Sequence, residues 1–423
     1  MVNANEPTHL STDHLPLITK YVDDMSGGLR MVSIEIHDNP EVGYKEKHAH
    51  AVLTDYLQQK DGWRVERSAY GIETAFVAVY DGCRPGPVVS FNAEYDALPG
   101  IGHACGHNLI AISTLAGALA TANLLKDEQL GGKVVLYGTP AEEGGGGKIK
   151  LLSAGAYRDH KVDISLISHP GITCDAALVR TAAYASLKVE YFGREAHAAA
   201  RPWDGINALD ALITAYNAIS VLRQQTQPGD IIQGQITNGG LRPNIIHAYS
   251  SGRFVVRSTS QARLDALKKR VIACFEAGAT ATGAELKLTL GGSYADHMPN
   301  RALGRSYRHF FNRMGGSIVR GDVDIIEAAT TASTDQGNIS YAMPSLSPNF
   351  WIRSEDADGK QLGGPHTPDF AKASRTEEAH SLAMRVGKAL AATAVDVLTR
   401  PELLKEAKDE FQKLKQDLQA ALR

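Results

Sequence analysis

Three short runs rich in valine, isoleucine and leucine lie in the first half of the chain, and each ends in a loop of polar residues. The runs cover residues 88–91, 133–137 and 163–168. Helix-like stretches separate them, and short apolar runs bounded by turn residues are typical of buried parallel strands. The pattern therefore predicts an α/β domain with a mostly parallel sheet flanked by helices.

The pattern changes near residue 181, where hydrophobic and polar residues begin to alternate as in a half-buried strand. The expected elements are strand 185–192, helix 205–223, strands 231–236 and 251–257, helix 261–277 and strand 285–290. This βαββαβ order predicts a two-layer ferredoxin-like domain. We place it at residues 181–296, inserted into a larger catalytic domain formed by residues 1–180 and 297–423.

Two further helices follow from the pattern. Residues 109–125 form the longest uncharged stretch, but it contains polar residues and is shorter than the roughly 20 residues of a membrane span. It therefore predicts a buried helix. Residues 401–423 place leucines and Phe411 at helical spacing, which predicts a terminal helix with one packed stripe. The alternative is a coiled-coil partner site, which the few heptads disfavour.

Composition narrows the class of protein. A length of 423 residues favours two domains, and 43% hydrophobic with 22% charged residues is typical of globular proteins. A formal charge of −3 gives no reason to expect nucleic acid or a membrane as partner. The first ten residues show no secretory signal, and the four cysteines form no CxxC pair, so we expect a cytoplasmic protein with reduced thiols.

The loops that follow the three runs carry metal-binding side chains. Cys105 and His107 lie two apart in a glycine-rich loop, Glu142 and Glu143 follow the second run, and His169 follows the third. Ligands of open parallel sheets collect beyond the carboxyl ends of the strands. Thiolate, imidazole and carboxylate together favour a metal, zinc above all. The pattern therefore predicts one metal site at this edge.

Two adjacent carboxylates can have different roles in a metal site. One of Glu142 and Glu143 would bind the ion while the other takes a proton from an activated water; a solvated acidic turn is the alternative. Asp96 suits a partner for the second nitrogen of a metal-bound histidine, or is simply a turn residue. The glycines before Lys148 resemble a phosphate loop, but Ile149 stands where serine or threonine is required.

Several motifs occur in a recognisable order along nearly the whole chain. They are Asp-Ala-Leu-Pro at 96–99, His-Ala-Cys-Gly-His at 103–107, Pro-Ala-Glu-Glu at 140–143, His169, Gly-Arg-Glu-Ala-His-Ala at 193–198, Gly239-Gly240 with Asn244, and His-Thr-Pro at 366–368. With them the chain resembles the aminoacylase/carboxypeptidase family of dinuclear metallohydrolases. It is most similar to the amidohydrolase branch, which includes auxin-conjugate hydrolases, p-aminobenzoyl-glutamate hydrolase and dipeptidases acting on Xaa-Lys or Xaa-Arg.

The resemblance implies a set of ligands for two divalent ions. The set is Cys105, His107, Glu143, His169 and His366. A soft thiolate favours zinc, with manganese or cobalt as alternatives. The resemblance also implies that Glu142 is the general base and that Asp96 supports a ligand.

The same resemblance implies that the inserted domain forms a homodimer. His197 would reach into the partner's site and stabilise the oxyanion, with help from Asn244. Arg257 is a candidate for holding a substrate carboxylate, with an exposed strand arginine as the alternative.

Two residues depart from the branch pattern. Asn108 stands where an aspartate is usual, so we expect the loop that carries Cys105 and His107 to be held in place differently. Gln336 replaces an aromatic residue that is usual near this place in the dipeptidase-like members. This departure puts in question the preference for substrate side chains that the resemblance implies.

We therefore expect a metal-dependent amidohydrolase that cleaves a small amide, either a dipeptide or an N-acyl amino acid. Three alternatives stay open at this stage. One is a cysteine hydrolase with Cys105 as nucleophile and His107 as base. The others are a non-catalytic binding protein with the same fold, and the same site running in reverse as an acyltransferase or ligase that joins an acyl group to an amine.

Overall fold

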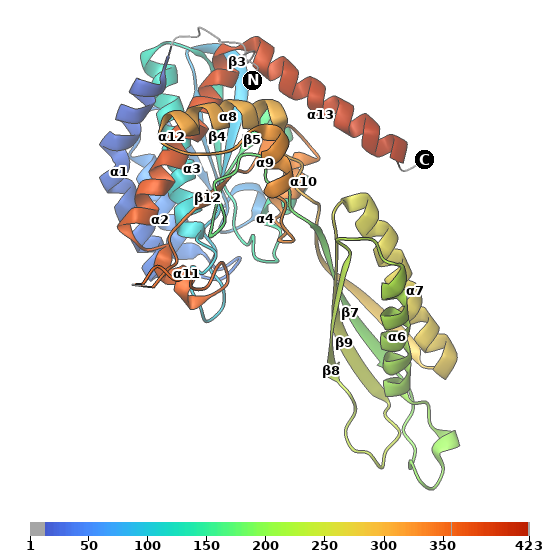
Figure 1. Ribbon diagram of the computed structural model, residues 1–423. Helices are drawn as coiled ribbons and strands as arrows, with labels where there is room; N and C mark the ends of the chain where they lie inside the picture. The colour runs from blue at the N-terminus through green and yellow to red at the C-terminus, as the bar shows by residue number, and fades with distance from the viewer. Residues whose placement is uncertain (1–12, 357, 422–423) are drawn as a thin grey trace.

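The computed structural model describes residues 13–356 and 358–421, which form two units (Figure 1). The larger unit is built on a six-stranded sheet of order β1-β2-β4-β3-β5-β11. The strands are β1 (Arg64–Arg67), β2 (Phe76–Asp81), β3 (Arg84–Ala93), β4 (Gly131–Gly138), β5 (Ile164–Leu166) and β11 (Ser345–Leu346). β4, β3, β5 and β11 run parallel, and β1 and β2 are antiparallel at one edge. The mostly parallel sheet is confirmed.

Both faces of this sheet are covered, because alternate side chains of a strand point to opposite faces. Val134 and Leu136 of β4 pack in the core beneath the long helices, whereas Val135 and Tyr137 pack in a second core on the other face. The long helices are α1 (Leu15–Asp38), α2 (Lys47–Gln58), α3 (His107–Asp127), α8 (Arg301–Arg313), α12 (Glu377–Thr399) and α13 (Pro401–Ala421).

The two helices expected from the pattern are present. α3 is apolar and long enough to cross a membrane by composition, but 94% of its apolar window is buried inside the protein, as predicted for a core helix. α13 buries Leu403, Ala407 and Phe411 along one stripe, and it packs on α8 and α12.

The second unit contains β7 (Ala183–Phe192), α6 (Ala208–Leu222), β8 (Ile231–Asn238), β9 (Tyr249–Ser258), α7 (Gln261–Thr282) and β10 (Glu285–Tyr294). Its sheet is antiparallel in the order β10-β7-β9-β8, with both helices on one face (Figure 1). This is the predicted βαββαβ arrangement, and it has a hydrophobic core of its own.

Short elements complete the described chain. They are η1 (Ala69–Gly71), α4 (Gly147–Ser153), α5 (Ala156–Asp159), β6 (His169–Gly171), η2 (Pro202–Asp204), η3 (Arg223–Gln225), α9 (Gly321–Glu327), α10 (Gln336–Ser340), β12 (Asn349–Trp351) and α11 (Pro368–Ala373). The run predicted as one strand at 163–168 ends early, because β5 stops at Leu166 and β6 pairs separately with β12. His169 therefore begins a separate short strand.

Candidate metal centre

The predicted metal ligands come together at the carboxyl edge of the parallel sheet. Two groups of three have their donor atoms within 4.8 Å of one another. They are Cys105 with His107 and His169, and Cys105 with Glu143 and His366. All five residues are thus in one cluster, and Cys105 belongs to both halves.

Gly106 makes the tight loop between Cys105 and His107 possible. Its φ of 78° lies in the left-handed region, and a Cβ there would stand 2.6 Å from Pro170 Cγ. Only glycine meets both conditions without strain. The loop can therefore lie against the segment after His169 while α3 begins at His107.

Two residues of the site that are not glycine also take left-handed backbone conformations. Ala141, just before Glu142, has a φ of 56°, and His366 has a φ of 69°. Such conformations cost about 1–3 kcal/mol each and occur where the surroundings impose them, often at functional sites. Ala141 is held by its N–H, which donates to Glu46 Oε1 at 2.8 Å.

Hydrogen bonds orient two of the histidines. His107 Nδ1 lies 3.0 Å from Asp96 Oδ1, and His169 Nδ1 lies 2.7 Å from the Pro170 carbonyl oxygen. Each Nδ1–H donates to its oxygen, which leaves Nε2 free to bind a metal. Asp96 also accepts the Glu143 N–H at 2.9 Å. Asp96 is therefore placed as a support for both halves of the centre.

The donor spacing fits a divalent ion. Cys105 Sγ lies 3.3 Å from His169 Nε2, and His366 Nε2 lies 3.1 Å from Glu143 Oε1. Donors on one tetrahedral zinc ion, with bonds of about 2.0–2.3 Å, stand roughly 3.3–3.6 Å apart. The His107 side chain is fully buried whereas that of His366 is 55% exposed, so the centre opens to solvent at the His366 side.

The electrostatics of the centre favour a cation. Burial raises the pKa of the Cys105 thiol well above its usual range, and a divalent ion is the charge that would stabilise the thiolate. Burial, followed by the nearby Glu94 carboxylate, raises the pKa of Glu142. Burial opposes charge on His107, but the Asp96 carboxylate outweighs it and raises the pKa of His107.

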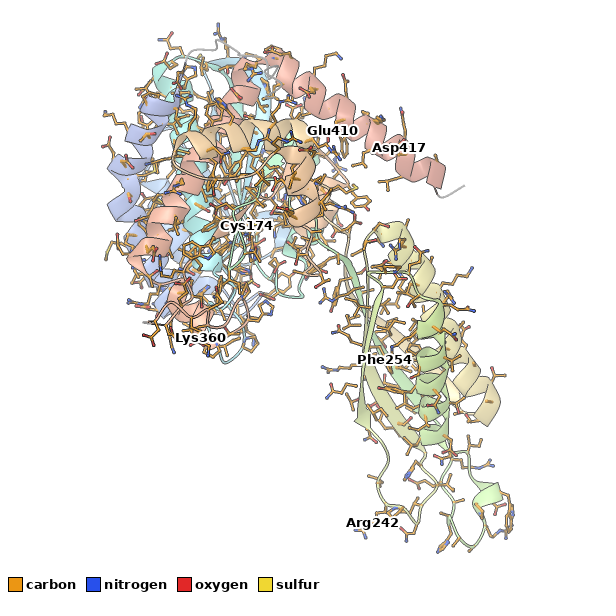
Figure 2. All side chains as sticks on the ribbon, viewed as in Figure 1. Cys174, Arg242, Phe254, Lys360, Glu410 and Asp417 are labelled. Atoms are coloured by element: carbon orange, nitrogen blue, oxygen red, sulfur yellow. The ribbon has the colours of Figure 1, made fainter. Side chains whose placement is uncertain are left out.

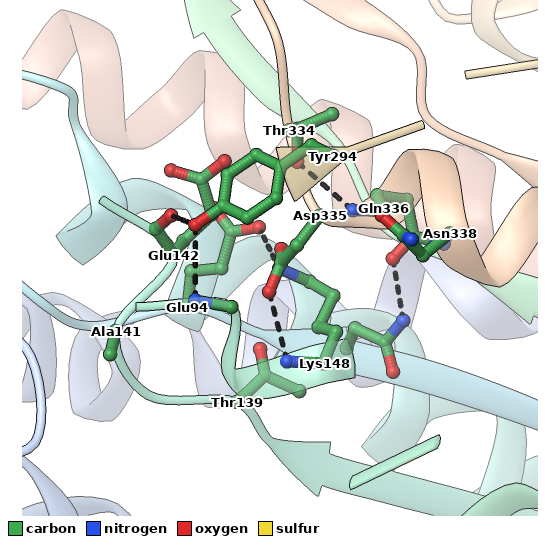
Figure 3. A network of polar contacts seen from close by, with 12 residues as sticks. Glu94, Thr139, Ala141, Glu142, Lys148, Tyr294, Thr334, Asp335, Gln336 and Asn338 are labelled. Atoms are coloured by element: carbon green, nitrogen blue, oxygen red, sulfur yellow. Dashed lines mark hydrogen bonds and ion pairs between the residues drawn. The ribbon is translucent and has the colours of Figure 1, made fainter. Parts of the chain in front are cut away.

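A buried ion network beneath Glu142 was missed by the sequence interpretation (Figure 3). The Lys148 side chain is completely buried, and its Nζ contacts carboxylate oxygens of both Glu94 and Asp335. The Lys148 N–H also donates to Asp335 Oδ2 at 2.9 Å. The only available signal was a lysine after four glycines that had no phosphate-loop role.

His197 and Asn244 are not near the centre of their own chain. His197 is exposed, and its Nδ1 accepts the Ala200 N–H at 3.0 Å. The backbone of His197 forms an isolated β-bridge with Ile245 in a neighbouring loop. Arg242 of that loop lies at the end of the second unit farthest from the larger one (Figure 2). Within one chain these loops do not reach the metal cluster.

Arg257 lies at the junction of the two units and is half-buried. Its guanidinium donates to Ser333 Oγ at 2.7 Å and to the Thr331 carbonyl oxygen at 3.2 Å, and it lies over the Tyr184 ring. The arginine is therefore not freely exposed, and none of these partners is a proposed metal ligand. Its substrate-binding role stays a prediction.

The two departures from the branch pattern have structural explanations. Asn108 Nδ2 donates to Ser33 Oγ and to the Ser374 carbonyl oxygen, both at 3.0 Å, which fastens the start of α3. Gln336 is fully buried, accepts from Asn92 Nδ2 at 2.7 Å and donates to Ser345 Oγ at 2.8 Å. An effect of Gln336 on substrate preference would therefore be indirect.

A cluster of cysteine, histidine and glutamate ligands at the carboxyl edge of an α/β sheet, with an antiparallel unit inserted in the chain, defines a metal-dependent hydrolase. The chain belongs to the peptidase family M20/M25/M40, whose sequence model matches residues 90–381. It is a metal-binding hydrolase that acts on amide bonds.

Named relatives support this assignment. The chain is 38% identical to the human Xaa-Arg dipeptidase over 405 residues, covering 92% of this chain and 90% of that protein. It is 26% identical to a p-aminobenzoyl-glutamate hydrolase chain of Escherichia coli, covering 94% and 95%. A dinuclear metal binding peptidase of the M20 family from Bacillus subtilis shares the fold, with a TM-score of 0.65, 19% identity and coverage of 88% and 99%.

Glu46, which holds the turn before Glu142, is expected to make the stability depend on pH. Burial raises the pKa of Glu46 to about 7 from an ordinary 4.5, so the folded protein holds a proton that the unfolded chain releases. Its contribution to stability is therefore full below pH 4.5 and is lost as the pH rises towards 7.

Between pH 5 and pH 8 the free energy of unfolding of the wild-type protein should fall as this contribution is lost. Replacing Glu46 with glutamine should make that fall smaller by about 1–3 kcal/mol. Urea denaturation in the presence of EDTA, followed by circular dichroism, measures this difference. Glu73→Gln, at an exposed carboxylate paired with Lys47, is the control that should behave as wild type. An unchanged difference in Glu46→Gln would contradict the prediction.

Proposed function

We propose that this hydrolase cleaves the amide bond of a dipeptide or an N-acyl amino acid, with two divalent ions and with Glu142 as general base. The observation that carries the proposal is the pair of donor groups that share Cys105, since two groups of three around one thiolate suit a dinuclear site. The thiolate favours zinc over manganese or cobalt.

The mechanism assigns tasks to the metal ligands, to Glu142 and to Asp96. Divalent ions at these donors would supply Lewis acidity towards the scissile carbonyl and lower the pKa of water. Glu142 takes a proton from the attacking water and later delivers it to the leaving amine. Its buried position and raised pKa suit a group that must hold that proton between the two steps. Asp96 keeps His107 and the Glu143 loop in place.

We propose Xaa-Arg dipeptides as the first substrates to test. The support is the 38% identity to the human protein of that name over nearly the full length of both chains. N-acyl amino acids are the second class, supported by the more distant plant IAA-amino acid hydrolase, which is 25% identical over 366 residues.

The active form is proposed to be a homodimer in which His197 and Asn244 complete the partner's site. Their loops lie far from the metal cluster of their own chain, which supports action in trans. β8 is one of the two edge strands of the second sheet, and its residues 233–237 are exposed. An open strand edge can pair with a second copy of the chain.

A cytoplasmic location is proposed as well. All four cysteines lie within the described residues and all are free thiols, and two of them, Cys83 and Cys174, are exposed. Exposed free thiols suit a reducing compartment.

The test of the proposed function is metal content together with turnover on a panel of dipeptides and N-acyl amino acids. We expect about two ions per chain, hydrolysis of Xaa-Arg dipeptides, loss of turnover after chelation and recovery with zinc, manganese or cobalt. Metal without hydrolysis of any amide would favour the binding protein. Net synthesis from an acid and an amine would favour the reverse reaction. A trapped acyl-enzyme that survives chelation would favour Cys105 as nucleophile.

A further inference from the structure

Glu94 is a buried carboxylate for which the proposed mechanism has no task. It follows β3, and its side chain is 2% exposed. One oxygen, Oε1, contacts Lys148 Nζ. The other, Oε2, is buried and has no hydrogen-bond partner among the residues that the structure describes. It lies 3.5 Å from His107 Nε2.

The atoms that face Glu94 Oε2 are also potential metal donors. His107 gives its Nδ1–H to Asp96, and its buried Nε2 is without a hydrogen-bond partner in the described part of the chain. Glu142 Oε2 lies 3.9 Å from the same nitrogen. Glu94, His107 and Glu142 thus form a third group of donors within 4.8 Å of one another, in addition to the two that contain Cys105.

Three potential metal donors that converge in a buried site suit a positive charge among them. A buried carboxylate oxygen without a partner is strongly unfavourable. A hydrogen bond between Glu94 and a protonated His107 would be poor, since 3.5 Å exceeds the usual N–H···O range of about 2.7–3.2 Å. A nitrogen and an oxygen on one tetrahedral zinc ion stand about 3.4 Å apart, close to the observed spacing.

Lys148 and Asp335 fix the orientation of Glu94. Lys148 Nζ is shared between the two carboxylates and is completely buried, so it cannot turn away without leaving both unpaired. One ammonium facing two carboxylates leaves one negative charge in excess. Glu94 Oε2, the oxygen that does not contact Lys148, lies on the His107 side.

We propose that Glu94 is an additional metal-binding carboxylate on the His107 side of the centre, and that Lys148 and Asp335 hold it in position. The proposal rests on the dinuclear centre of the proposed function and extends it. In this chain the ion next to His107 would be bound by a carboxylate whose other oxygen is paired with a lysine. Such a partner fixes the ligand in the same way that Asp96 fixes His107.

The test is zinc affinity, measured by competition with a chromophoric chelator on the purified full-length protein. Glu94→Gln keeps the shape and the contact with Lys148 but removes the negative charge. We expect the affinity for one of the two ions to fall at least about 10–100-fold, while the other is retained. Lys148→Met should weaken the same ion. Asp324→Asn, a buried carboxylate whose two backbone hydrogen bonds an amide oxygen can keep, is the matched control.

The cobalt form gives a second readout that does not depend on turnover. Loss of a carboxylate ligand should change the visible d–d bands of the Glu94→Gln protein, whereas thiolate charge transfer from Cys105 should persist. Two ions bound with wild-type affinity and an unchanged spectrum would overturn the role of Glu94 and leave the proposed function standing. A wild-type protein that binds no metal would instead overturn the proposed function.

A crystal structure of the zinc-loaded wild-type protein decides the matter even if the variants fail to fold. We expect Glu94 Oε2 at a bonding distance of about 2.0–2.2 Å from an ion near His107. Two ions with Glu94 turned away from both would overturn the proposal.

Discussion

Replacing Glu142 with glutamine is expected to lower kcat by about 10²–10⁴-fold, the usual contribution of a general base, while KM changes little. The amide keeps the size of the side chain but cannot take a proton from water. Glu142 is 7% exposed and lies beside the metal cluster, with its Oε2 3.9 Å from His107 Nε2. Steady-state kinetics on the best dipeptide of the panel measures the effect.

Metal analysis separates this loss from a loss of ions. The Glu142→Gln protein should retain close to two ions per chain, whereas Glu143→Gln should lose metal, since Glu143 is the glutamate grouped with Cys105 and His366. Wild-type turnover in Glu142→Gln would remove the general base from the mechanism. In that case Cys105→Ser, which should otherwise lower metal content, becomes the decisive variant for a nucleophilic thiol.

Replacing His197 with alanine is expected to lower kcat by about 10²–10³-fold, the usual effect of losing one oxyanion donor. The metal content and the fold should not change, because the His197 side chain is exposed and lies outside the metal cluster. Activity should return when this variant is combined with Glu142→Gln in one dimer. Random pairing makes half of the molecules mixed dimers, each with one intact site, so about a quarter of the sites should be active.

Co-expression with two different tags, followed by activity measurement, tests this complementation. A pair of variants within the same cluster, Glu142→Gln with Glu143→Gln, is the control and should recover nothing. Failure of the His197 pair to recover in a protein that sediments as a dimer would place His197 outside the partner's site. A monomeric protein with full activity would exclude the trans arrangement altogether.

Local sequence patterns predicted most of the fold because the spacing of apolar and polar residues within a strand or helix reflects which of its faces are buried. The runs at 88–91 and 133–137 became β3 and β4, since continuous apolar runs suit strands covered on both faces. The alternation from residue 185 onwards became the antiparallel sheet of the second unit for the opposite reason: residues of β8 face solvent. The run at 163–168 was misjudged in length, because pairing of β6 with β12 depends on a segment about 180 residues away.

The same logic holds for the site. Cys105, Glu143 and His169 were predictable because they follow strands whose ends meet at one edge of a parallel sheet. His366 has no such strand before it, and the resemblance to a family was the main indication of its role. Its side chain joins the centre because the His366 N–H bonds to the Ala104 carbonyl oxygen, a contact between distant segments.

The sequence by itself determined the class of elements, the order of the two units and the chemistry of the metal ligands, since all of these depend on residue type and local spacing. The tertiary structure alone decided which groups became partners. Lys148, an ordinary lysine in a glycine-rich loop, is buried between Glu94 and Asp335, the latter 187 residues further along the chain. Gln336 was drawn into the interior rather than to a substrate pocket. Burial and pairing of charges depend on what the rest of the chain places around them, and no local pattern records that.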